Sequence, residues 1–295
     1  MGKTRLSHSD KIAQYLFYLI AILMIIIVVY PLWFVIIASF SNPADIANGE
    51  VWLLPKHWDF GGYRELFKQK LIWTSYGNTI VYTAVGTLIA LIVNIPAGFA
   101  MSRKELYGRR AINVFYLIPM FVSGGLIPTY FVVKGFGLLN TFWVMVIPFS
   151  VSTYNIIVAR TFFKSNLPES LWEAAQLDGC STFRYFIQIA LPLSKSVLAV
   201  IGLWTAVGLW NSWFNALIYL NDDALMPLQL LLRRILISNQ SLLGAATGAM
   251  AMELRRLSDM MKYAAIVVST LPIMVLYPFL QKYFNKGVMI GAVKE

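Results

Sequence analysis

The sequence predicts an all-α protein that crosses a membrane several times. Of its 295 residues, 58% are hydrophobic and 13% are charged, whereas soluble domains are nearer to half apolar and a quarter charged. Six stretches free of charged residues are each long enough to cross a bilayer as a helix, which takes about 20 residues. They cover residues 12–44, 71–102, 111–133, 135–159, 196–221 and 263–281. We therefore predict a polytopic membrane protein with six transmembrane helices in a single domain at 13–281.

The Lys and Arg residues predict the orientation of these spans. An even number of spans places both termini on the same side of the membrane. The tails at 1–12 and 282–295 and the loops at 103–110 and 160–195 together carry 14 of the 24 basic residues, but only 6 of the 14 acidic ones. Since cytoplasmic loops are enriched in Lys and Arg, we expect these four segments to be cytoplasmic. The net charge of +10 then reflects topology and anionic lipid, and requires no nucleic acid.

Each remaining element has its own sequence signal. The first apolar run is expected to be retained, because it is too long for a signal peptide and lacks a small-residue cleavage site. Prolines at 96, 119, 128, 148 and 272 interrupt spans and predict broken or kinked helices around a pathway. Outside the membrane, a loop at 45–70 is rich in Trp and charge, and a helix is expected to begin at Pro227 and to rest on the membrane surface.

The spans contain no ionisable residue, which goes against a proton-coupled carrier, since such carriers need groups that change charge inside the membrane. The chain also lacks the G-x-x-x-x-G-K-[ST] loop that cradles nucleotide phosphates. Its single Cys and its two distant His residues offer no metal site. We expect no cofactor or metal in this chain, no enzymatic activity, and an energy source in another subunit.

A short amphipathic helix is expected within the loop at 160–195. Pro168 suits its first residue, because Pro needs no amide partner there, and Gly179 suits its end, because Gly tolerates a left-handed backbone. Its apolar sector consists of Leu167, Leu171 and Ala174, and its polar sector of Glu169, Glu173 and Gln176. Such a helix could dock on a basic partner protein through Glu173. The same pattern is typical of a helix that lies on lipid.

The spacing of this loop favours docking. Glu173-Ala174-Ala175 is followed by Gly179, and after nine further residues by Ile189-Ala190-Leu191-Pro192. This segment resembles the EAA loop of bacterial ABC-importer permeases, the cytoplasmic element that docks on an ATPase. All seven fixed positions of that family pattern are matched. Cys180 departs from it, since the family more often has Ala there.

The resemblance extends from about Leu71 to the end of the chain. Within the family the chain looks like the smaller permease of maltose-type carbohydrate importers, and is most similar to subunits that handle oligosaccharides. This narrower similarity rests on less specific motifs than the EAA loop. They are Gly124-Gly125-Leu126-Ile127-Pro128, Trp210-Asn211-Ser212-Trp213, and the tail at 287–294. The tail ends in Glu295, where the family commonly has Gly.

The resemblance implies a type I ABC-importer permease fold in a bacterial cytoplasmic membrane. It implies as partners a second permease that forms a heterodimer with this one, two ATPase subunits that use ATP and Mg, an extracytoplasmic solute-binding protein, and the lipid bilayer. Coupling to the ATPase would be carried by Glu173, Ala174, Ala175, Asp178 and Gly179. The cargo would be a carbohydrate, and an oligosaccharide in particular.

The fifth span carries the best candidate face for solute. Trp204, Gly208, Asn211 and Asn215 recur at i, i+4, i+7 and i+11. An aromatic ring stacks on the C–H face of a sugar, and carboxamides pair with its hydroxyls. Weaker polar pairs are Asn78 with Tyr82 on the second span and Ser152 with Asn155 on the fourth. The same residue types also hold membrane helices together, so packing remains an equal alternative for the fifth span and the favoured one for these pairs.

Two other functions remain open from the sequence. The first is an ABC-importer permease for a solute other than a sugar, because the EAA motif is shared across importers. The second is a stand-alone carrier or channel, which neither the EAA loop nor the absence of intramembrane charge favours. Copurification of an ATPase would exclude the stand-alone carrier.

Overall fold

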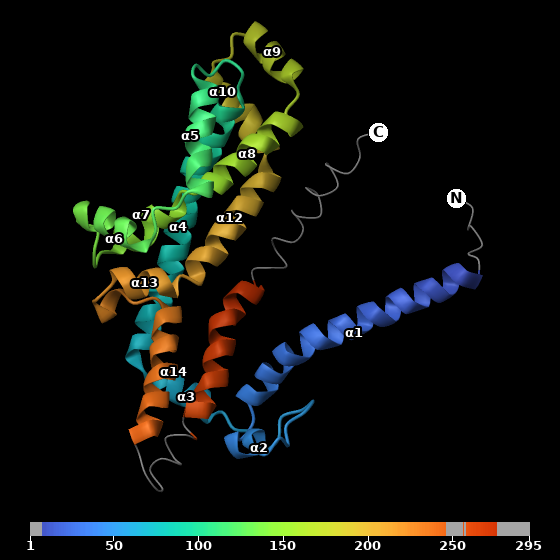
Figure 1. Cartoon of the computed structure of the whole chain (residues 1–295), viewed down its shortest axis with the longest axis vertical. Coiled ribbons are helices and arrows are strands. Elements are labelled where there is room, and N and C mark those ends of the chain that lie inside the picture. Colours follow the sequence, from blue (N-terminus) through green and yellow to red (C-terminus); the bar gives the residue numbers. More distant parts are fainter. Residues whose placement is uncertain (1–7, 246–255, 257, 276–295) are drawn as a thin grey trace. The chain divides into compact units, whose positions relative to one another are not determined.

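A computed structural model describes residues 8–245, 256 and 258–275 of the chain, and within them every regular element is a helix (Figure 1). One isolated antiparallel bridge joins Ser41 and Trp58. The all-α prediction is therefore confirmed. The tails predicted at 1–12 and 282–295 lie wholly or largely outside the described residues, as does the family-like tail at 287–294.

The chain forms two compact units, which are described separately here. Unit 1 consists of Met1–Gln69 with Ile235–Thr270, and unit 2 of Lys70–Arg234 with Leu271–Glu295. The prediction of a single domain at 13–281 stays a prediction.

Unit 1 begins with the long helix α1. Its helices are α1 (His8–Ser39), α2 (Pro43–Ala47), α3 (Gly61–Lys68), the later part of α14 (Leu228–Ala245) and most of the helix Ser258–Val275. Phe34 of α1 meets Tyr263 edge to face, with ring centroids 6.2 Å apart. A Cβ on Gly62 would lie 2.3 Å from the backbone oxygen of Met260, so α3 approaches the last helix at backbone distance.

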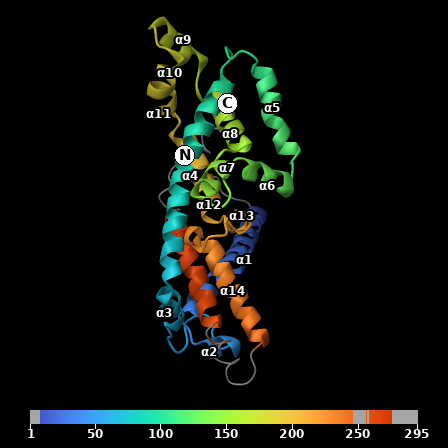
Figure 2. The same cartoon turned by 90° about the vertical axis from the view of Figure 1, so that its left-hand side faces the viewer.

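Unit 2 is organised around α4 (Lys70–Ser102), which packs against α7, α8 and α12. Its other elements are α5 (Arg109–Phe121), α6 (Leu126–Gly135), α7 (Phe142–Ser150), α8 (Thr153–Asn166), α9 (Glu169–Leu177), α10 (Thr182–Tyr185), the π-helical η1 (Phe186–Ala190), α11 (Leu191–Leu193), α12 (Lys195–Trp210), α13 (Trp213–Tyr219), the 3-10 turn η2 (Asp223–Leu225) and the start of α14. Figure 2 shows α9 and α10 close to one end of α4.

Helix length and composition agree with a membrane protein. In the described residues, Asp10–Ser39, Lys70–Ser102 and Ser258–Val275 are each long and apolar enough to cross a bilayer. Three further pairs of helices pass the same test jointly, and the number of spans reaches the predicted six if each pair is one span. The bends within these pairs are 120° between α5 and α6, 43° between α7 and α8, and 79° between Thr182–Leu193 and α12.

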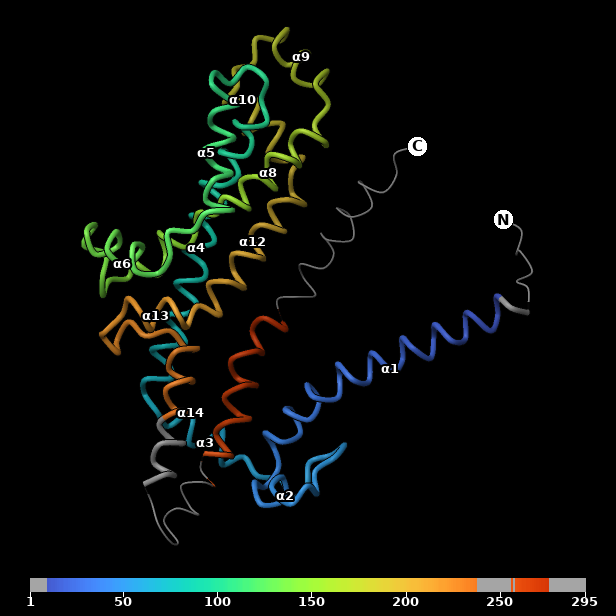
Figure 3. Tube along the Cα trace, in the orientation of Figure 1, coloured from blue at the N-terminus to red at the C-terminus, as the bar shows by residue number. Residues whose placement is uncertain are grey.

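The third predicted span, at 111–133, is a sharply bent pair of helices, because the chain turns after α5, as the trace in Figure 3 shows. Gly125, at the start of α6, has φ of +82°, a value that favours Gly over residues with a Cβ. The prolines within the predicted spans do not all coincide with breaks in the helices. Pro96 lies inside α4, which continues without a break for 33 residues.

The helix predicted after the fifth span is confirmed, and begins at Leu228, one residue after Pro227. Its first turns are buried in the protein, which differs from a helix resting on a membrane surface. Leu228, Leu230 and Leu231 are all buried, and the Leu228 amide donates to the Thr79 hydroxyl at 2.8 Å. This hydrogen bond ties the start of α14 to α4, and the first turns of α14 therefore pack against protein.

One buried amide supports the break between α7 and α8. Asn94 of α4 is fully buried, and its side chain donates to the Ser150 carbonyl at 3.0 Å and accepts from the Ser152 amide at 3.1 Å. Both are backbone groups that the break deprives of helical partners. Since an unpaired backbone group in hydrocarbon is costly, Asn94 makes this broken helix possible.

The crossing of α4 and α8 is a backbone-to-backbone approach at Gly98. A Cβ there would lie 2.5 Å from Ala159 Cβ and 2.8 Å from the Arg160 amide nitrogen. No real Cβ tolerates such distances, so the two helices would have to separate.

We therefore expect Gly98→Ala to lower the melting temperature of the purified protein, since overpacking costs about 1–3 kcal/mol. Gly77→Ala is the matched control, because Gly77 is exposed on the same helix and its Cβ would have open space. That variant should be neutral or slightly stabilising, as Ala is the better helix former. Equal melting temperatures for the two variants would contradict the close crossing.

Candidate functional site

The predicted amphipathic helix in the loop at 160–195 exists as α9, and its two ends follow the sequence closely. Pro168 caps the helix, one position before its expected place, and Glu169 is the first helical residue. At the other end Gly179 has φ of +71°. The Cys180 amide donates to the Ala175 carbonyl at 2.9 Å and the Gly179 amide to the Gln176 carbonyl at 3.0 Å. These two bonds form a Schellman motif, so Gly179 ends the helix as predicted.

The buried side of α9 differs from the expected apolar sector. Trp172 and Ala175 are the buried residues of the helix, whereas Ala174 is exposed. Leu167 and Leu171 are half-buried beside them. Placing Ala174 on the inner side was therefore wrong. The indole of Trp172 is the largest apolar group of α9, and its burial turns Ala174 outward.

The outer side of α9 is free to meet another protein. Glu173, Ala174, Gln176 and Asp178 are exposed, and within the described part of the chain Glu173 forms no ion pair. This side therefore offers a small methyl group beside an unpaired carboxylate. The coupling role of Glu173, Ala174, Ala175, Asp178 and Gly179 stays a prediction, and the burial of Ala175 leaves Ala174 as the alanine that a partner can reach.

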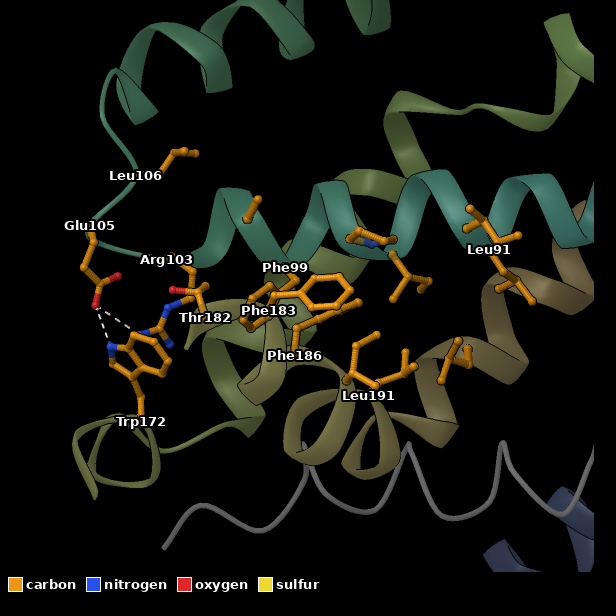
Figure 4. Close-up of a pocket in the computed structure, with 16 residues that line it drawn as sticks. Leu91, Phe99, Arg103, Glu105, Leu106, Trp172, Thr182, Phe183, Phe186 and Leu191 are labelled. Atoms are coloured by element: carbon orange, nitrogen blue, oxygen red, sulfur yellow. Dashed lines mark hydrogen bonds and ion pairs between the residues drawn. The ribbon is translucent and has the colours of Figure 1, made fainter. Parts of the chain in front are cut away.

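A cluster that we call the Trp172 anchor fixes α9 to the end of α4, and consists of Arg103, Glu105, Trp172 and Tyr185. The Arg103 guanidinium lies over the Trp172 ring, 4.4 Å from its centroid. The Trp172 indole Nε1 donates to Glu105 Oε1 at 2.9 Å, and Arg103 Nη2 donates to the same oxygen at 3.1 Å. Tyr185 closes the cluster with its ring edge to face against Trp172, at a centroid distance of 4.9 Å. Figure 4 shows Glu105 bridging Arg103 and Trp172.

The Trp172 anchor is stronger than the neighbouring surface contact. An exposed ion pair joins Lys104 to Glu169, and pairs of this kind contribute about 0–1 kcal/mol. A partly desolvated cation–π contact contributes up to about 2 kcal/mol, and a hydrogen bond to a charged group about 1.5–3 kcal/mol. Only 16% of the Arg103 side chain is exposed, so its contacts are less screened. The anchor therefore dominates the attachment of α9.

The environment of Glu105 keeps its carboxylate charged. Burial acts to raise the pKa of Glu105, but hydrogen bonds from its own backbone, from Arg103 and from Trp172, with the Arg103 charge, lower it overall. A lowered carboxyl pKa stabilises the folded state above the unfolded pKa, and the effect is lost as the pH falls through the folded value. The anchor is therefore complete at neutral pH.

Beside the Trp172 anchor the protein is hollowed by an apolar cavity of about 770 Å³ (Figure 4). Its walls come from α4, from α10 with η1 and α11, and from the start of α12. Phe99, Phe183 and Phe186 supply aromatic walls, and Arg103 and Glu105 lie at one end. The cavity lies beside the contact between the second half of α4 and the short helices that follow α9.

The second half of the EAA-loop motif, Ile189-Ala190-Leu191-Pro192, forms a tight connection to α12. Ile189 and Ala190 lie in the π-helical η1, in which the Leu191 amide donates to the Phe186 carbonyl five residues earlier. Pro192 follows at once and has no amide to donate, so the regular bonding pattern could not continue through it. Ala190 is fully buried in the same core as Trp172 and Ala175. The motif therefore joins α9 to α12 through packed side chains.

A second hollow, of about 460 Å³, brings together several of the residues predicted to contact solute. Trp204, Ser152, Asn155 and Asn215 all line it, as does Gly208. The sequence did not single out Tyr154, Thr205 and Ser212, which line it too. Tyr154 and Trp204 form a tilted aromatic pair with centroids 5.6 Å apart, and Asn155 Nδ2 donates to Thr205 Oγ1 at 3.4 Å. The hollow thus combines aromatic faces with uncharged polar groups.

Three predicted residues do not line this hollow. The expected face at 204, 208, 211 and 215 does not lie on one helix, because α12 ends at Trp210 and α13 begins at Trp213, and of its four residues Asn211 alone does not line the hollow. The Asn211 amide instead donates to the Val207 carbonyl at 2.9 Å and completes the end of α12. Asn78 donates to the Ala224 carbonyl at 2.7 Å, and the Tyr82 hydroxyl to the Leu225 carbonyl at 2.8 Å. These two residues hold η2 onto α4, which agrees with the favoured packing role.

Sequence reasoning missed two groups that build the site. Arg103 and Glu105 were counted only as loop charges, although both stand directly after the second span. Trp172, adjacent to the Glu-Ala-Ala run, was the visible signal, since a Trp three residues before Ala175 places both on one helix face. Asn94 was the other signal, a carboxamide within the apolar second half of the second span.

Comparisons with known proteins agree on one kind of protein. Residues 86–290 match a family described as the inner membrane component of binding-protein-dependent transport systems. Protein LplC of Bacillus subtilis is 39% identical over 268 residues, covering 91% of this chain and 90% of LplC. The polygalacturonan/rhamnogalacturonan transport system permease protein YtcP of the same organism is 35% identical, over 97% and 99%. A crystal structure of a bacterial ABC transporter involved in the import of the acidic polysaccharide alginate matches with a TM-score of 0.85 and 31% identity, over 96% of this chain and 100% of that one.

We predict that Glu105→Leu speeds backbone hydrogen exchange in α9 of the purified protein at neutral pH. Leu keeps side-chain bulk but accepts no hydrogen bond, so Trp172 and Arg103 lose their shared partner. Glu173→Gln is the matched control, because it removes a carboxylate that contacts no other charge in the described residues. Its exchange should equal that of the parent. Unchanged exchange in Glu105→Leu would show that α9 is held by other contacts.

Proposed function

The chain belongs to the family of binding-protein-dependent transport system inner membrane components, and we propose that it serves in an ATP-driven importer of oligosaccharides. It is a permease subunit of an ABC importer, a multi-pass membrane protein whose family membership goes against a stand-alone carrier. The observation that carries the coupling proposal is the exposed outer side of α9, where Glu173 has no ion-pair partner among the described residues. The opposite side of α9 is fixed by the Trp172 anchor.

The relatives support a carbohydrate as cargo. YtcP is a transport system permease for polygalacturonan and rhamnogalacturonan, and a relative in Streptomyces coelicolor, 25% identical, is a diacetylchitobiose uptake system permease. The hollow around Trp204 fits a sugar chemically, because it offers aromatic faces, hydroxyls and carboxamides without a charged lining residue. A solute of another class would find less to recognise there.

The partners follow from the family and from this chain's own surfaces. A structure of an alginate ABC transporter with a periplasmic protein bound to alginate pentasaccharide shares the fold, with a TM-score of 0.54 and 15% identity over 91% of this chain. We propose that its partners are a solute-binding protein outside the cell, a second permease beside this one, and two ATPase subunits that use ATP and Mg. One of the two ATPase subunits would bind α9. The Lys and Arg distribution supports cytoplasmic termini. Catalysis would lie in the ATPases.

In this proposal α9 is the element that receives force from an ATPase. Its outer side would seat in the ATPase, where Glu173 meets a basic group and Ala174 allows close approach. Its inner side is fixed to α4 through Trp172 and to η1 and α12 through the buried core. Since α12 and α8 line the hollow around Trp204, a displacement of α9 would reach the solute pathway through packed helices.

The coupling proposal predicts that Glu173→Lys lowers transport and solute-stimulated ATP hydrolysis together, at normal abundance of the complex. Charge reversal would repel a basic partner, whereas Glu173→Gln removes one attraction and should have a smaller effect. Both rates would be measured on the reconstituted complex, with basal ATP hydrolysis as the reference. Parental rates in Glu173→Lys would exclude docking through this carboxylate.

The cargo proposal predicts that Trp204→Leu lowers transport to different extents for different oligosaccharides. Loss of a stacking face costs on the order of 1 kcal/mol, which is several-fold in rate or affinity. Trp143→Leu is the matched control, because Trp143 is half-exposed on α7 and does not line the hollow. Transport would be measured per folded complex over a panel of neutral and acidic oligosaccharides and one amino acid. A uniform fall that follows abundance would assign Trp204 to packing instead.

A further inference from the structure

The loop between α1 and α3 in unit 1 is a small ordered structure with an apolar tip. Its two arms are joined where Ser41 bridges Trp58 and where the Asn42 amide donates to the Lys56 carbonyl at 3.2 Å. Between the arms, α2 leads into a turn at Gly49, whose φ is +70°. The tip is the segment at 51–55, which follows this turn.

The tip exposes three large apolar side chains in a row. Val51 is buried and fixes the tip to the loop, but Trp52, Leu53 and Leu54 are 69%, 66% and 73% exposed. Contiguous apolar exposure of this kind is rare on surfaces that face water. Val51 to Pro55 contains no charged residue. The tip therefore needs an apolar or interfacial environment.

A hydrogen bond sets the depth of the tip relative to α1. The Trp33 indole donates to the Leu53 carbonyl at 2.9 Å. Trp33 lies six residues before the end of α1 at Ser39, so the tip turns back along the helix by roughly 9 Å at 1.5 Å per residue. In Figure 1 the loop after α2 runs back toward α1.

From the length of the first span, we expect Trp33 to lie at the edge of the hydrocarbon layer. About 20 residues cross that layer, so a span that begins near Ile12 ends close to Trp33. Trp and Tyr concentrate at this level in membrane proteins, and Tyr30 and Trp33 stand there in α1. Since Leu53 is bonded to Trp33, the tip lies at the same level, beside the exposed apolar surface of α1.

The polar groups of the loop are arranged to leave the tip apolar. The Trp52 indole donates to the Gly49 carbonyl at 2.7 Å, so its exposed ring carries no unpaired donor. The polar side chains that flank the tip pair within the loop, Lys56 with Glu50 and His57 with Asp45. Such a surface suits the boundary between headgroups and acyl chains, where amphipathic rings are favoured.

From these contacts we infer that the tip, with Trp52, Leu53 and Leu54, inserts into the lipid interface on the far side of the membrane from the N-terminus. Lipid is favoured over a protein partner because the tip is continuous with the exposed apolar face of α1 and lies at the depth of Trp33. The inserted tip would anchor the external loop and hold the outer end of α1 at a fixed depth.

The test places a fluorescent probe at the tip in the full complex. Leu54→Cys, in a Cys180→Ser background, would be labelled with NBD and reconstituted in phosphatidylcholine vesicles containing lipid with a shallow doxyl quencher. Leu32→Cys on the exposed face of α1 is the lipid-facing reference, and Ala44→Cys at the start of α2 is the reference within the same loop. We expect quenching at position 54 to match that at 32 and to exceed that at 44.

Two results would overturn the inference. Quenching at position 54 no stronger than at 44 would place the tip in water. Loss of NBD accessibility at 54 only when the solute-binding protein is added would assign the tip to that protein. Neither result depends on the cargo or on ATP coupling, so this test and the tests of the proposed function fail separately.

Discussion

The stacking of Arg103 on Trp172, with Glu105 bonded to both, is the interaction on which the proposed coupling through α9 depends. It joins the short helix α9 to the end of a helix long enough to span the membrane. A helix of nine residues has little stability of its own, because isolated helices of this length are marginal in water. Without the Trp172 anchor, α9 could move without moving the helices to which it is attached.

The packing of α4 explains how a displacement of α9 would be carried through the Trp172 anchor to the rest of unit 2. Gly98 brings α4 to backbone contact with α8, and Gly86 lies against Leu209 of α12 and Ser150 of α7. Asn94 holds the break between α7 and α8 from within. Helices in backbone contact cannot slide without steric clash, so unit 2 would respond to α9 as one body. The hollow around Trp204 lies between two of the helices that α4 holds.

Much of the fold could be predicted from the sequence, because membrane spans follow from apolar length and the ends of α9 from Pro168 and Gly179. The broken helices could not be predicted in detail. Pro96 lies in an unbroken helix, whereas the breaks occur at Gly124-Gly125, at Val151-Ser152, at Ser194 and at Asn211-Ser212. Gly, Ser and Asn permit a break, but tertiary partners such as Asn94 decide where it is stabilised.

The same reason limits prediction of the site. Helical spacing placed Asn211 with Trp204, but spacing holds only within one helix, and α12 ends at Trp210. The Trp172 anchor joins residues nearly 70 positions apart, which no local pattern reveals. The apolar sector of α9 was assigned by hydrophobicity alone, and the indole of Trp172 decided the orientation instead. Local chemistry predicted the elements, and contacts between elements determined the functional faces.

The most direct test of the account is the distance between α9 and α4 during the transport cycle. Spin labels at Gln176 and Val93 would be followed by pulsed electron resonance in the reconstituted complex, with and without trapped ATP. If the Trp172 anchor makes α9 and α4 one body, the distance distribution should be the same in both states, and should broaden in Trp172→Ala. A shift between the two states in the parent protein would show that α9 moves independently of α4, and would contradict the account.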